Sequence, residues 1–331
     1  MVKNPIKKTI AIALISILTI SMLSGCSNGS GSSASSGGIK VLYSVCDVDD
    51  TFRASLTDGI IAAAKAEGIT LDVSYCGSSV DDQATEIAAA KAAGYDALIV
   101  RLTDVSTALQ MEVTSNDLPI VFVNNQPDDD YLEAGKYIYV GSQEEEAGEL
   151  QVEYVMSKLG NPTSLNVVIF EGEKGHSGTI GRTSAVKNTL KDKGVDVNYV
   201  FVDYATWSDT IAAEKLNIFF KTGQPYDAIF CNNDTMALGV CQALKDNGID
   251  PSSIPVMGVD ATSDGCASIA AGEMAFTVLQ DAEGQAQKAV EAIVAMASGG
   301  SISSIDGVSD DSKYVWVPFS PVDASNVSQY Q

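Results

Sequence analysis

Polar and aromatic side chains recur in this sequence just after short apolar runs that are typical of β-strands. They are Asp50, Phe52, Asn124, His176, Arg182, Trp207, Asn233, Asp260 and Gln280. Carboxylates accept hydrogen bonds, guanidiniums donate them and amides do both, so this set suits a ligand with many hydroxyl groups. The rings of Phe52 and Trp207 would cover the apolar C–H faces of a pyranose. The residue types therefore predict a sugar-binding site.

The segments that must position these residues alternate between strand and helix patterns. The strand pattern recurs at 39–46, 71–75, 97–102, 119–123, 166–170, 197–202, 228–231, 255–259, 275–279 and 314–317. Helical spacing of apolar residues occupies 52–63, 83–93, 105–115, 179–193, 208–221, 235–247, 263–271 and 283–297. This alternation predicts an α/β fold in which helices cover both faces of parallel sheets.

The length of the chain favours two such units, because about 290 residues follow the N-terminal region, enough for two domains of ordinary size. We expect two doubly wound, Rossmann-like lobes joined by a three-segment hinge. Residues 39–139 and 282–315 would form the N-terminal lobe, and residues 140–281 and 316–331 the C-terminal lobe. In open α/β sheets ligands bind beyond the carboxyl ends of the strands, where the polar and aromatic residues stand.

The first 25 residues resemble a bacterial lipoprotein signal peptide. Three lysines precede an apolar run at 10–20, which is too short to span a bilayer, and small residues lead to Cys26. The resemblance implies cleavage before Cys26 and a diacylglycerol on its sulfur, and the alternative is an ordinary cleaved signal. Residues 26–38, rich in Ser and Gly, would form a flexible tether. We expect the protein at the extracytoplasmic face of the cell membrane, held there only by its lipid anchor.

The charge of the chain excludes two classes of partner. The 331 residues carry 43 acidic and 20 basic side chains, a formal charge of −23, and three of the lysines lie in the expected signal peptide. A nucleic-acid partner needs a basic surface, so none is expected. Close adhesion of the protein body to anionic lipid is disfavoured for the same reason.

The five cysteines that follow Cys26 show no CxxC spacing, so no zinc site is indicated. Cys46 and Cys76 end two apolar runs that we interpret as neighbouring strands, which makes a disulfide possible in an exported protein. Buried free thiols are the other interpretation, and the one that we favour.

Several stretches resemble those of the type I periplasmic sugar-binding proteins, and most closely their galactose/glucose-binding branch. They are residues 50–52, 119–124, 171–182 with the pattern GExGHxxxxxR, 205–207, 232–237, 258–261 and 277–281. The resemblance covers nearly all of the chain that follows the expected signal peptide.

This resemblance implies a role for most of the candidate residues. Six would hydrogen-bond sugar hydroxyls or the ring oxygen: Asp50, Asn124, His176, Arg182, Asn233 and Asp260. Phe52 and Trp207 would stack on the two faces of the ring. The implied function is capture of a monosaccharide and its delivery to an ABC transporter permease, by a monomer without enzymatic activity or cofactor.

Three departures from the branch limit the prediction. Gly178 and Gln280 stand where the branch has Asp and Asn, so one end of the sugar would be recognised differently. The branch's calcium loop has no counterpart at 160–164, and we expect no bound metal.

Two other functions remain open. A sensory receptor would have the same site and present its closed form to a chemoreceptor or histidine kinase. A less favoured alternative is an extracellular glycosidase that uses Asp50 and Asp260, whose carboxylates would then flank the scissile bond. DNA-binding repressors of similar fold are excluded by the export signal and the acidic charge.

Some patterns receive a structural interpretation. Glu144–Glu146 is expected to be a solvated first helical turn, and Asp234 to cap the helix that follows it. The four glycines between 172 and 181 are interpreted as a flexible loop entering a helix, since they match no phosphate-binding motif. Residues 299–311 are expected to be a surface loop.

Overall fold

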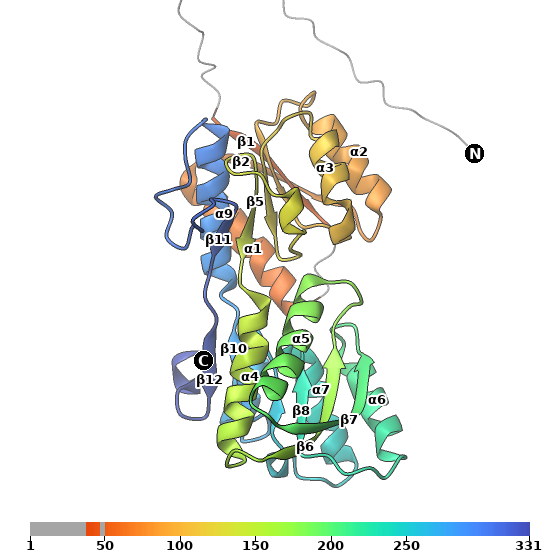
Figure 1. Ribbon diagram of the computed structural model, residues 1–331. Helices are drawn as coiled ribbons and strands as arrows, with labels where there is room; N and C mark the ends of the chain where they lie inside the picture. Colours follow the sequence, from red (N-terminus) through yellow and green to blue (C-terminus); the bar gives the residue numbers. More distant parts are fainter. Residues whose placement is uncertain (1–37, 47–49) are drawn as a thin grey trace, which may run out of the picture. The chain divides into compact units, whose positions relative to one another are not determined.

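The strands of the described residues, 38–46 and 50–331, form two six-stranded sheets in the computed structural model (Figure 1). These residues belong to one compact unit, 38–331. The expected signal peptide, Cys26 and the tether up to residue 37 lie outside the described residues.

The first sheet has the strand order β11-β5-β4-β3-β1-β2, and its strand pairs are all parallel. Its strands are β1 (Lys40–Val45), β2 (Thr70–Tyr75), β3 (Ala97–Val100), β4 (Ile120–Val123), β5 (Tyr137–Gly141) and β11 (Tyr314–Trp316). Helices α1 (Thr51–Glu67) and α9 (Ala282–Ala297) pack on one face, and α2 (Val80–Ala90) and α3 (Ala108–Thr114) on the other.

The second sheet has the order β12-β10-β9-β8-β6-β7, with β12 antiparallel to β10. Its strands are β6 (Ser164–Glu171), β7 (Asp196–Tyr204), β8 (Ala228–Cys231), β9 (Val256–Met257), β10 (Phe276–Leu279) and β12 (Ser320–Asp323). Helices α4 (Glu144–Lys158) and α5 (Ser177–Asp192) pack on one face. The other face is covered by α6 (Asp209–Phe220), α7 (Asp234–Asp246) and α8 (Ser263–Ala270).

The expected fold class, with two lobes of parallel sheet and covering helices, is therefore confirmed. The sequence patterns missed two strands. β5 reads Tyr-Ile-Tyr-Val-Gly, a buried apolar run of ordinary length that the predicted strands do not include. β12 reads Ser-Pro-Val-Asp, which has no apolar pattern and places proline in an edge strand.

The chain crosses between the sheets three times. The crossings lie between β5 and α4, between β10 and α9, and between β11 and β12. The first sheet extends slightly beyond the boundaries expected at 139 and 315, because Trp316 still pairs with Gly141 in the ladder.

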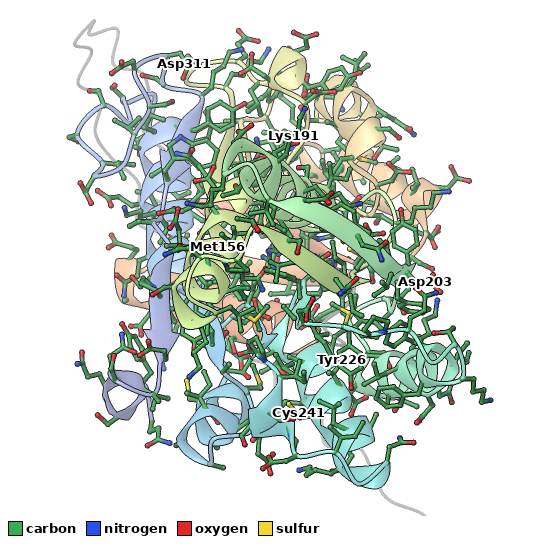
Figure 2. All side chains as sticks on the ribbon, turned by 60° about the horizontal axis from the view of Figure 1, so that its bottom comes forward. Met156, Lys191, Asp203, Tyr226, Cys241 and Asp311 are labelled. Atoms are coloured by element: carbon green, nitrogen blue, oxygen red, sulfur yellow. The ribbon has the colours of Figure 1, made fainter. Side chains whose placement is uncertain are left out.

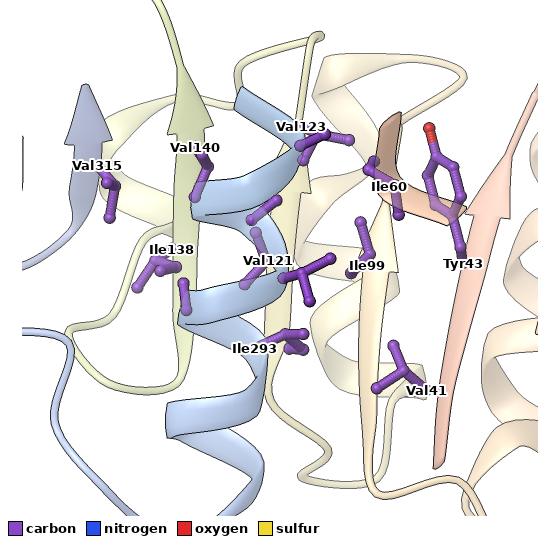
Figure 3. Packing of buried hydrophobic residues seen from close by; sticks show 14 of the residues in the cluster. Val41, Tyr43, Ile60, Ile99, Val121, Val123, Ile138, Val140, Ile293 and Val315 are labelled. Atoms are coloured by element: carbon purple, nitrogen blue, oxygen red, sulfur yellow. The ribbon is translucent and has the colours of Figure 1, made fainter. Parts of the chain in front are cut away.

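Helix α9 belongs to the first lobe although it follows the second in the sequence. Figure 3 shows Ile293 of α9 beside Val121 and Ile138 of the first sheet. The segment 299–311 is more than a surface loop, because it buries Ile302 and Ile305 in the same core. These apolar contacts anchor the returning chain to the first sheet.

The five described cysteines are buried free thiols, and Cys241 on α7 is labelled in Figure 2. The Cys46 thiol approaches the Arg101 carbonyl at 3.8 Å, and the Cys76 thiol approaches the Val45 carbonyl at 3.6 Å. The structure therefore shows no disulfide between Cys46 and Cys76.

Close packing of α4 on α5 leads to a first prediction. A Cβ at Gly148 would lie 2.4 Å from the Arg182 carbonyl oxygen and 2.7 Å from the Ala185 Cβ. Gly148→Ala should therefore lower the free energy of unfolding by about 1–3 kcal/mol in urea titrations, despite the better helix propensity of alanine. Ser157→Ala, at an exposed position of the same helix, should not be destabilising. Equal stability of Gly148→Ala and the wild type would contradict the packing argument.

Candidate functional site

All nine predicted site residues line a single cavity, together with Arg53. Asp50, Phe52 and Asn124 reach it from the first lobe, and most of the others from the second. The side chains leave a volume of only about 20 Å³, enough for roughly one water molecule. Two wider openings adjoin the cavity and share some of its residues. A ligand of sugar size therefore exceeds the central space and would extend into these openings or displace side chains.

His176 begins α5, and its ring is fixed by the backbone there. Nδ1 accepts a hydrogen bond from the Gly178 N–H at 3.1 Å, so the proton of the neutral ring is on Nε2. Nε2 is buried and has no partner among the described residues. Burial, followed by the charges of Arg101, Arg53 and Arg182, holds the pKa of His176 well below 6.5. The neutral ring therefore presents one N–H donor that a ligand can use.

Arg182 is buried in the middle of a polar cluster. Its Nε donates to Glu144 Oε2 at 2.7 Å, Nη1 to the Asn232 carbonyl at 2.6 Å and Nη2 to Gln280 Oε1 at 2.9 Å. Asp260 Oδ1 lies 3.8 Å from Nη1. The Nε2 amide of Gln280 is buried without a partner among the described residues. Glu144 is only 2% exposed, so its expected solvated position is wrong.

Two aspartates enter the cavity in different electrostatic settings. Asp50 caps α1 and pairs with Arg53 Nε at 2.7 Å. The same guanidinium reaches Glu173 of the other lobe at 2.7 Å, which makes it a contact between the lobes. Burial raises the pKa of Asp260 well above its ordinary value, and Arg182 counteracts that rise.

Asn233, not Asp234, caps α7, because its Oδ1 accepts from the Met236 N–H at 3.0 Å. Asp234 instead accepts from the Thr262 N–H at 2.8 Å and from the Thr277 hydroxyl at 2.5 Å. Burial raises the pKa of Asp234 to about 7. These bonds hold the loop that carries Asp260, whose φ is 115°. The role expected for Asp234 was wrong because its side chain turns to this loop.

The two aromatic residues expected to stack on a sugar ring both lie at the cavity. Trp207 stands edge-on to the His176 ring, with centroids 5.3 Å apart, and its Nε1 is buried without a partner among the described residues. Its φ of 63° lies in the left-handed region. A Cβ at Gly172 would lie 2.1 Å from the Trp207 ring. Phe52 also lines the cavity, so both rings are present at the site.

The glycines between 172 and 181 serve packing as well as loop geometry. Gly178 and Gly181 lie inside α5, and a Cβ at Gly181 would lie 2.6 Å from the Glu144 Cβ. Of these glycines, Gly175 has a positive φ, 87°. The flexible-loop interpretation is therefore wrong for the two helical glycines, because each adjoins Glu144 of α4.

Sequence reasoning missed four charged residues around the site: Arg53, Arg101, Glu144 and Glu173. Arg101 Nε donates to Asn124 Oδ1 at 2.8 Å, and this hydrogen bond holds the side chain of Asn124, which lines the cavity. Arg53 and Arg101 lie just after strands β1 and β3. Inspection of every residue at the carboxyl ends of the strands, which identified Asp50 and Phe52, would therefore also have found these two arginines. Glu144 carried no such signal, because its role depends on a partner 38 residues away.

The described residues contain no cluster of three or more metal-ligating His, Cys, Asp or Glu side chains. Among the same residues, no helix has the length and apolarity that a bilayer span requires.

Comparison with known proteins gives a family match over residues 41–301, to the periplasmic binding protein domain. The chain belongs to the periplasmic binding proteins. A putative rhizopine-binding protein of Rhizobium meliloti is 30% identical over 289 residues, which is 86% of this chain and 89% of the relative. The D-galactose/methyl-galactoside binding periplasmic protein MglB of Haemophilus influenzae is 27% identical over 91% of this chain and 95% of its own.

Solved periplasmic binding proteins share the architecture. An ABC transporter solute binding protein of Bacillus halodurans, solved with bound myo-inositol, superimposes with a TM-score of 0.79 at 26% identity and covers 90% of this chain and 98% of its own. The expected family is thus confirmed, while the galactose branch is one of several among the relatives. As a periplasmic binding protein the chain is not an enzyme, and the glycosidase alternative falls away.

The buried imidazole of this periplasmic binding protein leads to a second prediction. Below pH 6.5 an unfolded chain protonates its histidine, whereas the native His176 stays neutral because its pKa is lowered. The native state should therefore lose up to about 1.4 kcal/mol of stability per pH unit below 6.5 from this group. Urea titrations should show a smaller loss for His176→Asn, which keeps a side-chain helix cap.

The difference between wild type and His176→Asn isolates the imidazole, because His176 is the only histidine in the chain and both proteins carry the same carboxylates. Parallel curves of stability against pH for wild type and His176→Asn would show that the ring is not held neutral.

Proposed function

We propose that this periplasmic binding protein captures a monosaccharide between its lobes and delivers it to an ABC transporter permease. One observation carries the proposal: ten residues from both lobes line one cavity, and three of them have buried polar atoms without a partner among the described residues. These atoms are His176 Nε2, Trp207 Nε1 and Gln280 Nε2. Buried donors without partners are costly, and ligand hydroxyls would satisfy them.

The nine predicted residues supply the roles that such a ligand needs. Asp50 and Asp260 would accept hydrogen bonds from hydroxyls, and His176 and Arg182 would donate to ligand oxygens. Phe52 and Trp207 would cover the ring faces. Hinge closure around the ligand is the motion that periplasmic binding proteins use.

The identity of the sugar is the finer part of the proposal, and a glucose- or galactose-like hexose is our first candidate. The relatives are named for rhizopine and for galactose, and the solved structure of similar fold holds myo-inositol. Gln280 lines the cavity where the galactose/glucose branch has Asn, and Gly178 stands where that branch has Asp, which favours a ligand that differs from galactose at that end. A thermal-shift panel of glucose, galactose, ribose and myo-inositol would test this, because a ligand of the native state raises its stability.

Trp207→Ala should raise the Kd of the best ligand in that panel by about a hundredfold or more, measured by calorimetry. The ring is nearly buried and contributes both a face and an N–H donor. Tyr204→Ala removes an exposed aromatic residue three positions earlier and should leave the Kd unchanged. Near-normal affinity of Trp207→Ala would overturn the site assignment.

We further propose that the mature chain is a monomer anchored by a diacylglycerol on Cys26, with residues 27–38 as its tether. A double-chain anchor holds a protein on a membrane, whereas a single acyl chain gives only marginal binding. Cys26→Ser should shift the expressed protein from the membrane fraction to the soluble fraction after cell fractionation. Retention of the variant on the membrane would contradict the anchor.

A further inference from the structure

Each of the three crossings between the lobes places one residue beside the same side chain. Glu144 begins α4 just after the first crossing, Gln280 lies in the second, and Phe319 lies in the third. The Arg182 guanidinium bonds Glu144 at 2.7 Å and Gln280 at 2.9 Å, and its central carbon lies 5.9 Å from the Phe319 ring centroid. One guanidinium therefore joins the three segments that connect the lobes.

The same guanidinium also faces the ligand cavity. Its central carbon lies 5.9 Å from the Trp207 ring, and Asp260 lies 3.8 Å from Nη1. An arginine has five N–H donors, and the bonds to Glu144, Asn232 and Gln280 use three of them. Two donors remain, and because Arg182 lines the cavity they could serve Asp260 and a ligand oxygen.

The ion pair between Arg182 and Glu144 depends on the close packing of α4 against α5. Gly148 and Gly181 let the two helices approach, since a Cβ at either position would lie under 3 Å from the opposite helix. Both charged side chains are about 4% exposed or less. Because a buried charge left without its partner is strongly destabilising, the pair is held together in the native state.

The Glu144 carboxylate makes its polar contact with Arg182. Its Oε2 accepts from Arg182, and its Oε1 is buried without a hydrogen-bond partner among the described residues. Glu144 does not line the cavity. Its neighbour Glu146 accepts from the Phe319 N–H at 3.4 Å, which links the first crossing to the third as well.

We propose that Glu144 is a positioning residue that couples ligand binding to the hinge through Arg182. The inference rests on the proposed function in that the ligand binds in the cavity beside Arg182. Glu144 holds the guanidinium beside the three crossings, while Asp50, Phe52 and Asn124 line the same cavity from the first lobe. A ligand that accepts a hydrogen bond from this oriented guanidinium and also contacts the first-lobe residues makes both sets of contacts only when the lobes are closed, and this differential affinity shifts the population toward closure.

Glu144→Gln tests the coupling, because glutamine keeps the shape and an acceptor for Nε–H but removes the charge that fixes Arg182. We expect its Kd for the sugar to rise about tenfold, through faster dissociation in stopped-flow experiments. Without ligand, small-angle scattering should give a larger radius of gyration than the wild type. With saturating sugar, the two radii should agree.

Glu149→Gln is the matched control, since it removes the same charge from an exposed position of α4 and should match the wild type in all three measurements. Phe319→Leu loosens the third crossing without changing charge and should alter the ligand-free radius in the same direction as Glu144→Gln. If Glu144→Gln fails to fold, a wild-type radius for Phe319→Leu would contradict the coupling, because the contacts of Arg182 with the crossings would then not hold the hinge.

Wild-type rates and radii for Glu144→Gln would overturn the coupling while leaving the proposed function intact. Failure of the wild type to bind any sugar would instead overturn the proposed function. In that case the ligand-free scattering of Glu144→Gln against the wild type still decides whether Glu144 holds the hinge.

Discussion

Burial of the Arg182 guanidinium is the constraint on which much of the second lobe and the hinge depend. A charge removed from water needs close partners, and the fold supplies them from distant parts of the chain: Glu144, the Asn232 carbonyl and Gln280. To place the first of these, α4 and α5 must approach at Gly148 and Gly181. The close packing of α4 on α5 and the positions of Glu144 and Gln280 at the crossings all serve to give the buried Arg182 guanidinium its hydrogen-bond partners.

Much of the site could be predicted from the sequence because two local signals coincide there. Strand patterns locate the carboxyl ends of parallel strands, and the residue types at those ends have a recognisable chemistry. Asp50, Asn124, Asn233 and Asp260 were found in this way, and the structure brings them to one cavity. Resemblance to a known family added the residues that stand farther from a strand end, such as Arg182.

The rest could not be predicted because it depends on contacts between distant segments. In the sequence Glu144 looks like part of an ordinary, solvated acidic first turn. Packing of α5 against α4 buries it and pairs it with Arg182. Asp234 reads as a cap, but its side chain turns to Thr262 and Thr277 once β10 and α8 are in place. Strand β12 has no apolar pattern and exists only because β10 offers it an edge.

The position of Trp207 has a practical consequence for anyone studying this protein in solution. The chain has only two tryptophans, and this one packs edge-on to the neutral His176 ring with the Arg182 guanidinium nearby. A ligand that enters the cavity must change the polarity and the quenching groups around that indole. The proposed binding site thus contains its own fluorophore, and on that assignment the emission of Trp207 would follow occupancy in real time without a label.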